Sequence, residues 1–479
     1  MNLLADRSQE TAWRVEHDLL GSRRVPAEAY YGIQTLRAKE NFDITHMRLE
    51  HFPSLIRSIA MVKKAAARAN ATLGGLQTPV AGAIQQACDE IIDGQFHDQF
   101  IVDMVQGGAG TSTNMNANEV IANRSLEILG EPRGNYKVVH PNNHVNLSQS
   151  TNDVYPTSIR LAILIDCGSL IEEMKALCCA LGTKASEFAD VLKVGRTQLQ
   201  DAVPMTLGQE FLAFRATILK DIDRFNESAR YLEKVNLGGT AIGTGINSAP
   251  SFGAKAVREL SMISGIEFGL SSNLIEATSD TGDFVSFSGL LKRYAVKLSK
   301  ICNDLRLLSS GPAAGFGEIN LPAVQPGSSI MPGKVNPVIP EAVNQVAYQV
   351  IGNDLTVTFA AEAAQLQLNA MEPVIVLNIL QSTDMLLRAT GLLSRRCVSG
   401  ISANRQGCKN MVDRSLCTVA ALNPHIGYDR ASHVAEEARK SGRSVVEIVL
   451  DKRWMSAKQV EEALEPERLT RNLLSGAQM

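Results

Sequence analysis

The sequence predicts a mainly α-helical protein built around a long helical bundle. Within residues 287–308, apolar side chains recur at alternating spacings of four and three, the heptad pattern of a helix that packs along its length against others. A second pattern of the same kind covers residues 207–225. Aromatic residues make up 5% of the chain and β/α alternation is missing, so helix-on-helix packing is favoured over a β-sandwich or a parallel sheet.

The helical patterns divide the chain into three expected domains. Residues 1–150 contain many turn signals between short helical patterns and are expected to form loops and modest helices. Residues 151–401 carry both heptad patterns and form the predicted central bundle. Further helices of this bundle are expected over residues 155–189, 340–364 and 373–396. Residues 402–479 are expected to form a small helical third domain. Helices that are apolar on more than one face must bury those faces, so association between chains is expected.

Charge and cysteine content narrow the class of protein. The 47 basic and 50 acidic side chains give a formal charge of -3, which gives no reason to expect a nucleic acid or an acidic membrane as partner. The eight cysteines are scattered without a CxxC motif and are expected to be core thiols of a reducing compartment. The first residues mix charges and contain no apolar core of a signal peptide, so we expect a cytoplasmic protein without a membrane segment.

Several polar segments rich in glycine, serine or proline lie between apolar stretches. They cover residues 106–112, 148–153, 195–201 and 327–337. Each could be only a turn or a helix cap, but together they form a set of hydroxyl and amide donors suited to carboxylates. Residues 238–245 look like a phosphate cradle, yet they lack a preceding strand and the Lys-Ser/Thr of a P-loop, so nucleotide binding is not expected.

The segment GSSIMPGKVNP, residues 327–337, resembles the signature loop of the fumarase/aspartase superfamily, whose members eliminate an amine or hydroxyl β to a carboxylate and release fumarate. Residues 148–153, 195–204 and 236–247 resemble the other shared blocks in the same order. The resemblance extends from Tyr30 to beyond Gly427. It implies a three-domain, mostly helical fold and a homotetramer with a core of twenty helices, in which three subunits contribute to each active site.

Within the superfamily, residues 106–112, 318–322 and 365–373 resemble aspartate ammonia-lyases. Gln198 stands where fumarases carry a histidine of the acid/base apparatus. An ammonium group leaves as neutral ammonia, and a glutamine can hold it without acting as an acid. The resemblance therefore implies reversible elimination of ammonia from L-aspartate to give fumarate. The alternatives are a fumarate hydratase, a lyase for a related amino acid, and a non-catalytic structural protein such as the lens crystallins related to argininosuccinate lyase.

The resemblance also implies residue roles. Ser328 would be the general base, its alkoxide stabilised by backbone N–H groups and by Lys334. The β-carboxylate would be held by Thr111, Ser150, Thr151 and Ser329, the α-carboxylate by Thr197, Lys334 and Asn336, and the amine by Thr111, Asn152 and Gln198. No metal or cofactor is required, although the resemblance leaves room for activation by a divalent cation such as Mg²⁺. His140 and His144 are expected to be turn and cap residues rather than catalytic groups.

Overall fold

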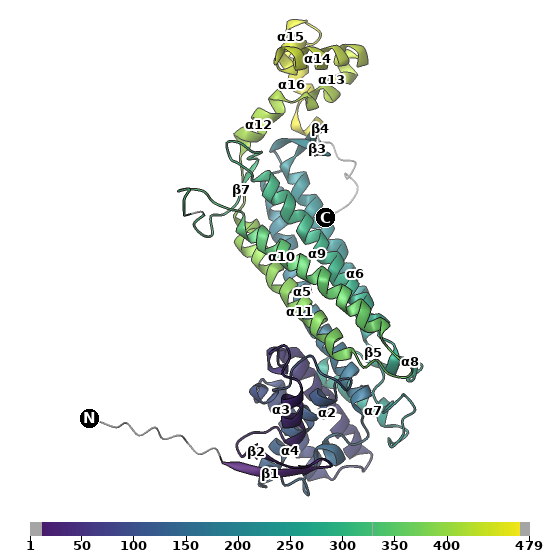
Figure 1. The fold of residues 1–479 in the computed structure, drawn as a ribbon. Helices are drawn as coiled ribbons and strands as arrows, with labels where there is room; N and C mark the ends of the chain where they lie inside the picture. Colours follow the sequence, from purple (N-terminus) through teal and green to yellow (C-terminus); the bar gives the residue numbers. More distant parts are fainter. Residues whose placement is uncertain (1–11, 328, 470–479) are drawn as a thin grey trace, which may run out of the picture. The chain divides into compact units, whose positions relative to one another are not determined.

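The computed structural model describes residues 12–327 and 329–469. These residues form helices accompanied by four short two-stranded sheets (Figure 1). The five longest helices run side by side, as the figure shows: α5 (Thr151–Glu187), α6 (Leu207–Leu232), α9 (Gly282–Leu308), α10 (Val338–Glu362) and α11 (Glu372–Arg396). The predicted mainly α fold and its long helices are confirmed.

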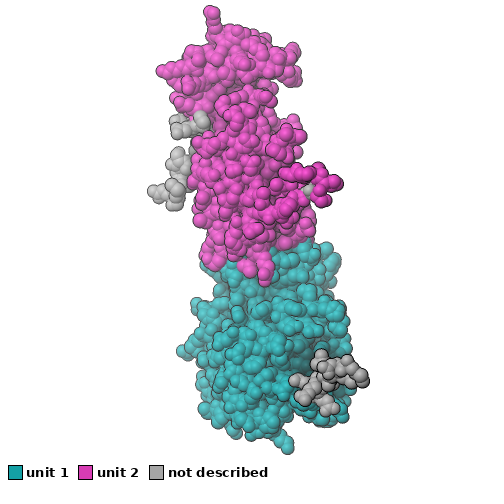
Figure 2. Space-filling view, turned by 90° about the vertical axis from the view of Figure 1, so that its left-hand side faces the viewer, with its two compact units in different colours: residues 1–170, 224–292, 349–385 teal, residues 171–223, 293–348, 386–479 magenta. Residues whose placement is uncertain are grey.

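The chain divides into two compact units, coloured separately in Figure 2. The first comprises Met1–Leu170, Arg224–Lys292 and Gln349–Met385, and the second comprises Ile171–Asp223, Arg293–Tyr348 and Leu386–Met479. Each of the five long helices contributes residues to both units. The expected division into residues 1–150, 151–401 and 402–479 is a different partition and stays a prediction.

The heptad pattern of α9 corresponds to buried side chains. Phe287, Leu291 and Leu298 are at most 1% exposed. Polar contacts join the same helix to its neighbours. The buried carboxylate of Asp221 on α6 forms ion pairs with two cations of α9, Lys297 at 2.8 Å and Arg293 at 3.1 Å. Helix packing therefore follows the apolar seam that the sequence predicts, with charged side chains at its edge.

The first 150 residues are more helical than the sequence suggests. They contain the hairpin β1 (Trp13–Asp18) and β2 (Gly21–Pro26), followed by α1 (Ile33–Asn41), α2 (Pro53–Thr72), α3 (Thr78–Ile92) and α4 (Thr111–Ile128). The expectation of modest helices is wrong for α2 and α4. Helix α4 has no apolar stripe because it buries asparagines. These asparagines can be buried because they are hydrogen-bonded: the side chain of Asn116 accepts a hydrogen bond from Ile101 N at 3.0 Å and donates one to Gln99 O at 2.9 Å.

A buried carboxylate fixes the start of α1. Glu119 of α4 accepts hydrogen bonds from the backbone N–H groups of Gly32 and Gln34, both at 2.8 Å, and from Thr35 N at 3.0 Å. Burial raises the pKa of Glu119 to about 7. A Cβ at Gly32 would lie only 2.6 Å from a carboxylate oxygen of Glu16, so any larger residue there would have to displace this buried side chain.

The remaining elements are short. They are β3 (Leu192–Thr197), β4 (Gln200–Thr206), β5 (Lys234–Val235), α7 (Phe252–Ser264), β6 (Gly269–Leu270), α8 (Glu276–Ser279), β7 (Ile319–Asn320), β8 (Ser402–Ala403), α12 (Arg405–Arg414), α13 (Val419–Ile426), α14 (Tyr428–Ser441), α15 (Val445–Asp451), α16 (Ala457–Ala463) and α17 (Pro466–Leu469). The helices after α12 bury their own apolar cluster, which includes Leu422, Val434 and Ile448. The expectation of short helices in residues 402–479 is confirmed for the part that the structure describes.

Helix α5 is long and apolar enough by length and composition to cross a membrane, but 78% of its most apolar window is buried inside the fold. Such burial is typical of a core helix. The cysteines are free, and seven of the eight are buried, whereas Cys179 on α5 is exposed. The expectation of core thiols is thus wrong for Cys179, because it lies on the solvent-exposed face of α5.

Glu372, at the start of α11, is a buried acid with one oxygen that lacks a hydrogen-bond partner among the described residues. Its side chain is 2% exposed, and the oxygen without a partner is Oε2. Burial raises its pKa to about 8, although the positive charge of Arg160 opposes the shift. At neutral pH the folded chain therefore keeps a proton on this carboxyl group.

We predict that Glu372→Gln makes the protein more stable in alkaline solution. The unfolded carboxyl titrates near 4.5 and the folded one near 8. Between these pH values only the folded chain holds the proton, so the free energy of unfolding falls as pH rises, by about 1–4 kcal/mol in total. Thermal unfolding at about pH 5 and about pH 9 should show a smaller decrease for the variant. Glu461→Gln, at an exposed position, serves as the control, and parallel curves for Glu372→Gln and wild type would contradict the prediction.

Candidate active site

Two helix N-termini meet in the first unit and bring together part of the predicted site. Asn114 Nδ2, one turn into α4, donates a hydrogen bond to Thr151 Oγ1 at 3.1 Å. Thr111 begins α4 and Thr151 begins α5, so their hydroxyls belong to neighbouring first turns. The positive end of each helix dipole favours an anion at such a place. This arrangement is suited to a carboxylate.

Ser150 and Asn152 lie on either side of Thr151 and are held by local hydrogen bonds. Ser150 Oγ accepts a hydrogen bond from Asn152 N at 3.3 Å, and Ser150 N donates one to Asp153 Oδ1 at 2.9 Å. Asn152 Nδ2 donates to Ala241 O at 2.8 Å. A hydrogen bond therefore joins the first turn of α5 to the glycine-rich segment 238–245, almost ninety residues later in the sequence.

A cavity of roughly 500 Å³ adjoins this turn. Its lining includes Asn146, Ser150, Thr240 and Ala241. Lys63 of α2, which is fully buried, donates from Nζ to Asn146 Oδ1 at 2.7 Å and to Gln149 Oε1 at 3.1 Å. Burial lowers the pKa of Lys63 to about 7. The segment before α5 is thus held by a buried ammonium group that sequence reasoning missed, because no local pattern separates Lys63 from the other basic residues of α2.

Thr197 and Gln198 lie in the second unit, at the tip of the β3–β4 hairpin. Thr197 pairs with Gln200, and the two residues between them, Gln198 and Leu199, both have positive φ, 54° and 61°. Such a turn usually takes Asn-Gly, because other residues are strained there by about 1–3 kcal/mol each. Thr197 and Gln198 are exposed. Strain at an exposed tip is a mark of a functional position.

The signature loop also lies in the second unit. Lys334 and Asn336 line a cavity of roughly 520 Å³ together with Arg306. Ser329 and Lys334 are exposed, and Asn336 is half-buried. A Cβ at Gly327 would overlap the carbonyl oxygen of Lys334, so the two ends of the loop approach each other as only glycine permits. Ser328, the predicted base, lies outside the described residues.

The predicted site residues therefore form two groups. Thr111, Ser150, Thr151 and Asn152 belong to the first unit, and Thr197, Gln198, Ser329, Lys334 and Asn336 belong to the second. Hydrogen bonds join Asn152 to Ser150, and Asn114 of α4 to Thr151, while Lys334 and Asn336 share a cavity. The chemical role of each residue stays a prediction. Among the described residues, no group of three His, Cys, Asp or Glu side chains is placed to hold a metal ion.

The two histidines near these segments act as caps. His140 Nδ1 accepts hydrogen bonds from Asn142 N at 3.0 Å and from Asn143 N at 3.3 Å. His144 Nδ1 accepts one from His140 N at 2.9 Å. Burial lowers the pKa of both imidazoles, so each is neutral and can accept these bonds at neutral pH. The expectation of turn and cap roles is confirmed.

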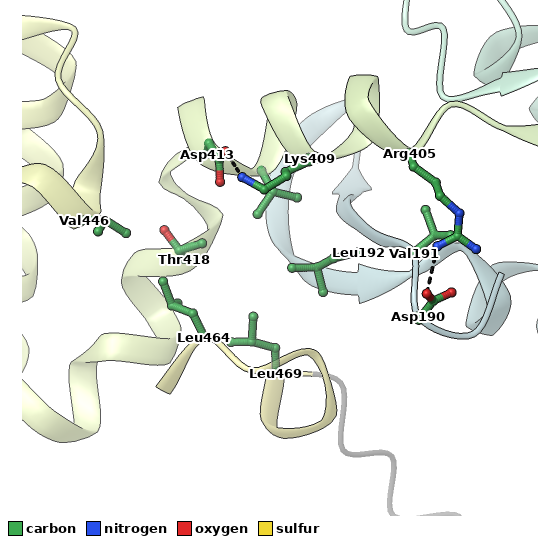
Figure 3. A pocket seen from close by; sticks show the side chains of 11 residues that line it. Asp190, Val191, Leu192, Arg405, Lys409, Asp413, Thr418, Val446, Leu464 and Leu469 are labelled. Carbon is green, nitrogen blue, oxygen red and sulfur yellow. Dashed lines mark hydrogen bonds and ion pairs between the residues drawn. The ribbon is translucent and has the colours of Figure 1, made fainter. Parts of the chain in front are cut away.

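A different cavity, of roughly 350 Å³, lies beside α12 (Figure 3). Its floor is apolar and includes Leu192 and Leu464, while its rim carries the ion pairs Arg405–Asp190 and Lys409–Asp413. Both cations are paired, and the lining contains none of the predicted carboxylate-binding residues. It is less suited to a dicarboxylate than the two polar cavities.

Backbone strain gives a signal that the sequence alone does not reveal. Among the described residues, positive φ occurs at ten non-glycine positions. Seven of these lie within the polar segments or the blocks that carry the family resemblance: Ala109, Ser148, Gln198, Leu199, Thr240, Asn247 and Leu366. Strain of this kind persists only where the surrounding structure enforces it. The segments therefore hold fixed, unusual conformations rather than ordinary turns.

Comparison with known proteins agrees with the geometry. A lyase family model matches residues 21–352, and a model of the fumarase C carboxyl terminus matches residues 419–471. The chain is 57% identical to an aspartate ammonia-lyase of Pseudomonas aeruginosa, covering 95% of this chain and 96% of that protein. It is 55% identical to an aspartate ammonia-lyase of Helicobacter pylori, covering 95% and 97%.

Solved structures give the same result. A fumarate lyase:delta crystallin from Brucella melitensis, bound to cobalt, superposes with a TM-score of 0.94 at 58% identity, covering 96% of this chain and 100% of that one. A class II fumarase from Schistosoma mansoni has a TM-score of 0.89 at 34% identity, covering 95% and 98%. The chain therefore belongs to the fumarase/aspartase superfamily of lyases. Within it, this enzyme groups with the aspartate ammonia-lyases, which are carbon–nitrogen lyases.

We predict that Gly110→Ala lowers the lyase rate by more than the backbone strain of an alanine at this position would. Gly110 precedes α4 with φ 89°, and a Cβ there would overlap the ring of Tyr155 on α5. The two helix starts must then separate, which moves Thr111, so the lyase rate should fall at least ~10-fold because small displacements weaken catalysis strongly. Fumarate absorbance measures this rate.

Gly130→Ala is the matched control, because Gly130 has φ 78° at the other end of α4 and a Cβ would meet nothing within 4 Å. It carries similar backbone strain without the overlap. Equal rates for the two variants would contradict the prediction.

Proposed function

We propose that the enzyme catalyses the reversible elimination of ammonia from L-aspartate to give fumarate. The observation that carries this proposal is the similarity to aspartate ammonia-lyases over nearly the whole chain, 57% in one case, in a fold that sets Thr111 and Ser150 to Asn152 at two adjoining helix N-termini. Such helix starts favour a substrate with carboxylate groups.

The difficult step is removal of a proton from the carbon beside the β-carboxylate. The electron pair left behind converts that carboxylate into a dianionic aci-carboxylate, which has to be stabilised. Hydroxyls of Thr111, Ser150, Thr151 and Ser329 donate hydrogen bonds that strengthen as the charge increases, and the positive ends of α4 and α5 act in the same direction. The grip on the β-carboxylate is thus tighter in the transition state than in the substrate.

Ser328 takes the proton in this proposal. A serine hydroxyl is a weak base at neutral pH unless its alkoxide is stabilised, and the neighbouring Lys334 ammonium and loop N–H groups supply positive charge. The carbon–nitrogen bond then breaks as the double bond of fumarate forms, and ammonia leaves. Lys334, Asn336 and Thr197 hold the α-carboxylate, while Thr111, Asn152 and Gln198 face the amine.

We further propose a homotetramer with a core of twenty helices and active sites shared by three subunits. Helix α10 supports association, since Ile351, Leu355 and Phe359 lie on one face of it and are 38%, 56% and 66% exposed. These spacings form a continuous apolar stripe. Ile330, in the signature loop, is 84% exposed as well. A neighbouring subunit would cover such surfaces.

The enzyme is proposed to need no cofactor and to act in the cytoplasm. A divalent cation such as Mg²⁺ would act as an activator and not as a required cofactor, and L-aspartate and fumarate are the proposed small-molecule partners. Nucleic acid and membrane partners are not expected, because the formal charge of the chain is only -3.

L-Aspartate, and not L-malate, is expected to yield fumarate. The residue after Thr197 is a glutamine, which cannot donate a proton to a leaving hydroxide as an acid would. Fumarate absorbance with the pure protein and each substrate separately measures both reactions. Faster turnover of malate would favour a fumarate hydratase, and turnover of neither would favour another amino acid as substrate.

Ser328→Ala should stop the chemistry while leaving binding intact. Loss of a general base typically lowers kcat ~10²- to 10⁴-fold. Succinate, a dicarboxylate that cannot react, should bind with nearly unchanged affinity, because the variant keeps the carboxylate-binding side chains. His140→Gln and His144→Gln are the controls and should have small effects. A Ser328→Ala enzyme that keeps more than about a tenth of wild-type kcat, beside a dead histidine variant, would overturn the role of Ser328.

A further inference from the structure

The glycine-rich segment 238–245 is bound to the start of α5 by one buried carboxylate. Asp153 is fully buried. Its Oδ1 accepts a hydrogen bond from Ser150 N at 2.9 Å, and its Oδ2 accepts bonds from Gly238 N at 2.9 Å and Thr240 N at 3.0 Å. The carboxylate therefore joins two backbone segments that are far apart in the sequence.

Side-chain amides add to this connection. Asn152 Nδ2 donates to Ala241 O at 2.8 Å, and Asn236 Nδ2 donates to Asn152 O at 2.9 Å. Asn236 Nδ2 also reaches Thr278 Oγ1 at 3.0 Å. The start of α5 and the glycine-rich segment are thus hydrogen-bonded along several residues.

The glycine-rich segment is tightly packed on its other side. Gly238 has φ 92°, and a Cβ there would lie 2.6 Å from Gly253 Cα. Gly243 also has φ 92°, and a Cβ there would overlap the backbone of Leu274 and Ile275. Because the segment cannot shift away, it can serve as a rigid support for α5.

The same segment lines the cavity beside α5. Ser150, Thr240 and Ala241 all contribute to the cavity of roughly 500 Å³. Thr240 is 5% exposed, and its hydroxyl has no hydrogen-bond partner among the described residues. A buried hydroxyl without a partner is unfavourable by ~1–3 kcal/mol unless something else binds it. The hydroxyl oxygen itself is enclosed, so the Thr240 side chain has to rotate toward the cavity before a substrate oxygen there can bind it.

A negative charge beside a carboxylate site would normally oppose substrate binding. Here three backbone N–H groups surround the carboxylate of Asp153, and the buried ammonium of Lys63 attracts it. The charge is therefore directed at the backbone rather than at the cavity. An asparagine would bring an NH₂ group against at least one of these N–H donors, so the carboxylate cannot be replaced by its amide without loss.

We propose that Asp153 is a positioning residue for the substrate site: it fixes Ser150, Thr151 and Asn152 against the glycine-rich segment, whose Thr240 hydroxyl forms the second wall of the pocket for a substrate carboxylate. The proposal rests on the proposed function, because the carboxylate is that of L-aspartate. It assigns roles to Asp153 and Thr240, two residues of the family blocks to which the resemblance gave none.

Asp153→Asn tests the positioning role. We expect a fall of ~100-fold in kcat/KM for L-aspartate, as for a misplacement of about 1 Å, and at least ~10-fold weaker binding of succinate by calorimetry. Asp166→Asn is the matched control, since Asp166 is also a largely buried acid of α5 and accepts a bond from Ser54 Oγ at 2.8 Å. The control should lower the melting temperature without changing KM or succinate affinity.

Thr240→Val tests the second wall independently. The hydrogen bond from Thr240 to Asp153 is made by the backbone N–H, so this variant keeps the connection and removes only the hydroxyl. We expect succinate to bind ~5- to 10-fold more weakly, as for one lost hydrogen bond. Unchanged succinate affinity would overturn the role of Thr240.

The two proposals can fail separately. Should Asp153→Asn keep wild-type kcat/KM and succinate affinity and lose only melting temperature, like the control, the positioning role is wrong. Should the wild-type enzyme not turn over L-aspartate, the proposed function fails, whereas succinate binding by the variants still decides the positioning role. If Asp153→Asn does not fold, Thr240→Val decides: weaker succinate binding supports the shared pocket and unchanged binding overturns it.

Discussion

Two helices in this fold begin where a buried carboxylate accepts hydrogen bonds from backbone N–H groups, and the arrangement of the candidate site depends on these contacts. Glu119 accepts hydrogen bonds from the first N–H groups of α1, and Asp153 accepts them from Ser150 before α5 and from Gly238. A carboxylate at a helix start satisfies N–H groups that would otherwise lack partners and interacts favourably with the helix dipole. Since the carboxylates come from different parts of the chain, they also set where one helix begins relative to another segment.

The helices and the loops divide the proposed chemistry between them. The first turns of α4 and α5 carry Thr111 and Thr151, whose positions are fixed by packing along the full helices. Lys334 lies on an exposed loop, where Pro332 and Gly333 precede it and Pro337 follows it. A rigid group of donors suits stabilisation of a developing charge, and a loop suits the entry of substrate and the exclusion of water. The division explains why the donors are so far apart in the sequence.

Sequence periodicity predicted the fold where one physical effect dominates. The seam of α9 is read directly because Phe287 and Leu291 repeat at helical spacing and are buried. Sequence periodicity failed to predict α4, because buried asparagines take the place of apolar residues on its buried face. The site was predicted from motif resemblance, but Lys63 and the role of Asp153 depend on contacts between distant segments. No local pattern contains that information, and Ser328 lies outside the described residues.

The strained tip of the β3–β4 hairpin also bears on how this enzyme can be engineered. A sequence chosen for thermal stability alone would place Asn-Gly at Gln198 and Leu199, because that pair adopts positive φ with little strain. If Gln198 faces the leaving amine, such an exchange would raise the melting point and remove a substrate contact together. Selection for heat resistance without selection for turnover would therefore drive this turn toward an inactive sequence, and the turn should be kept fixed when stabilised variants are designed.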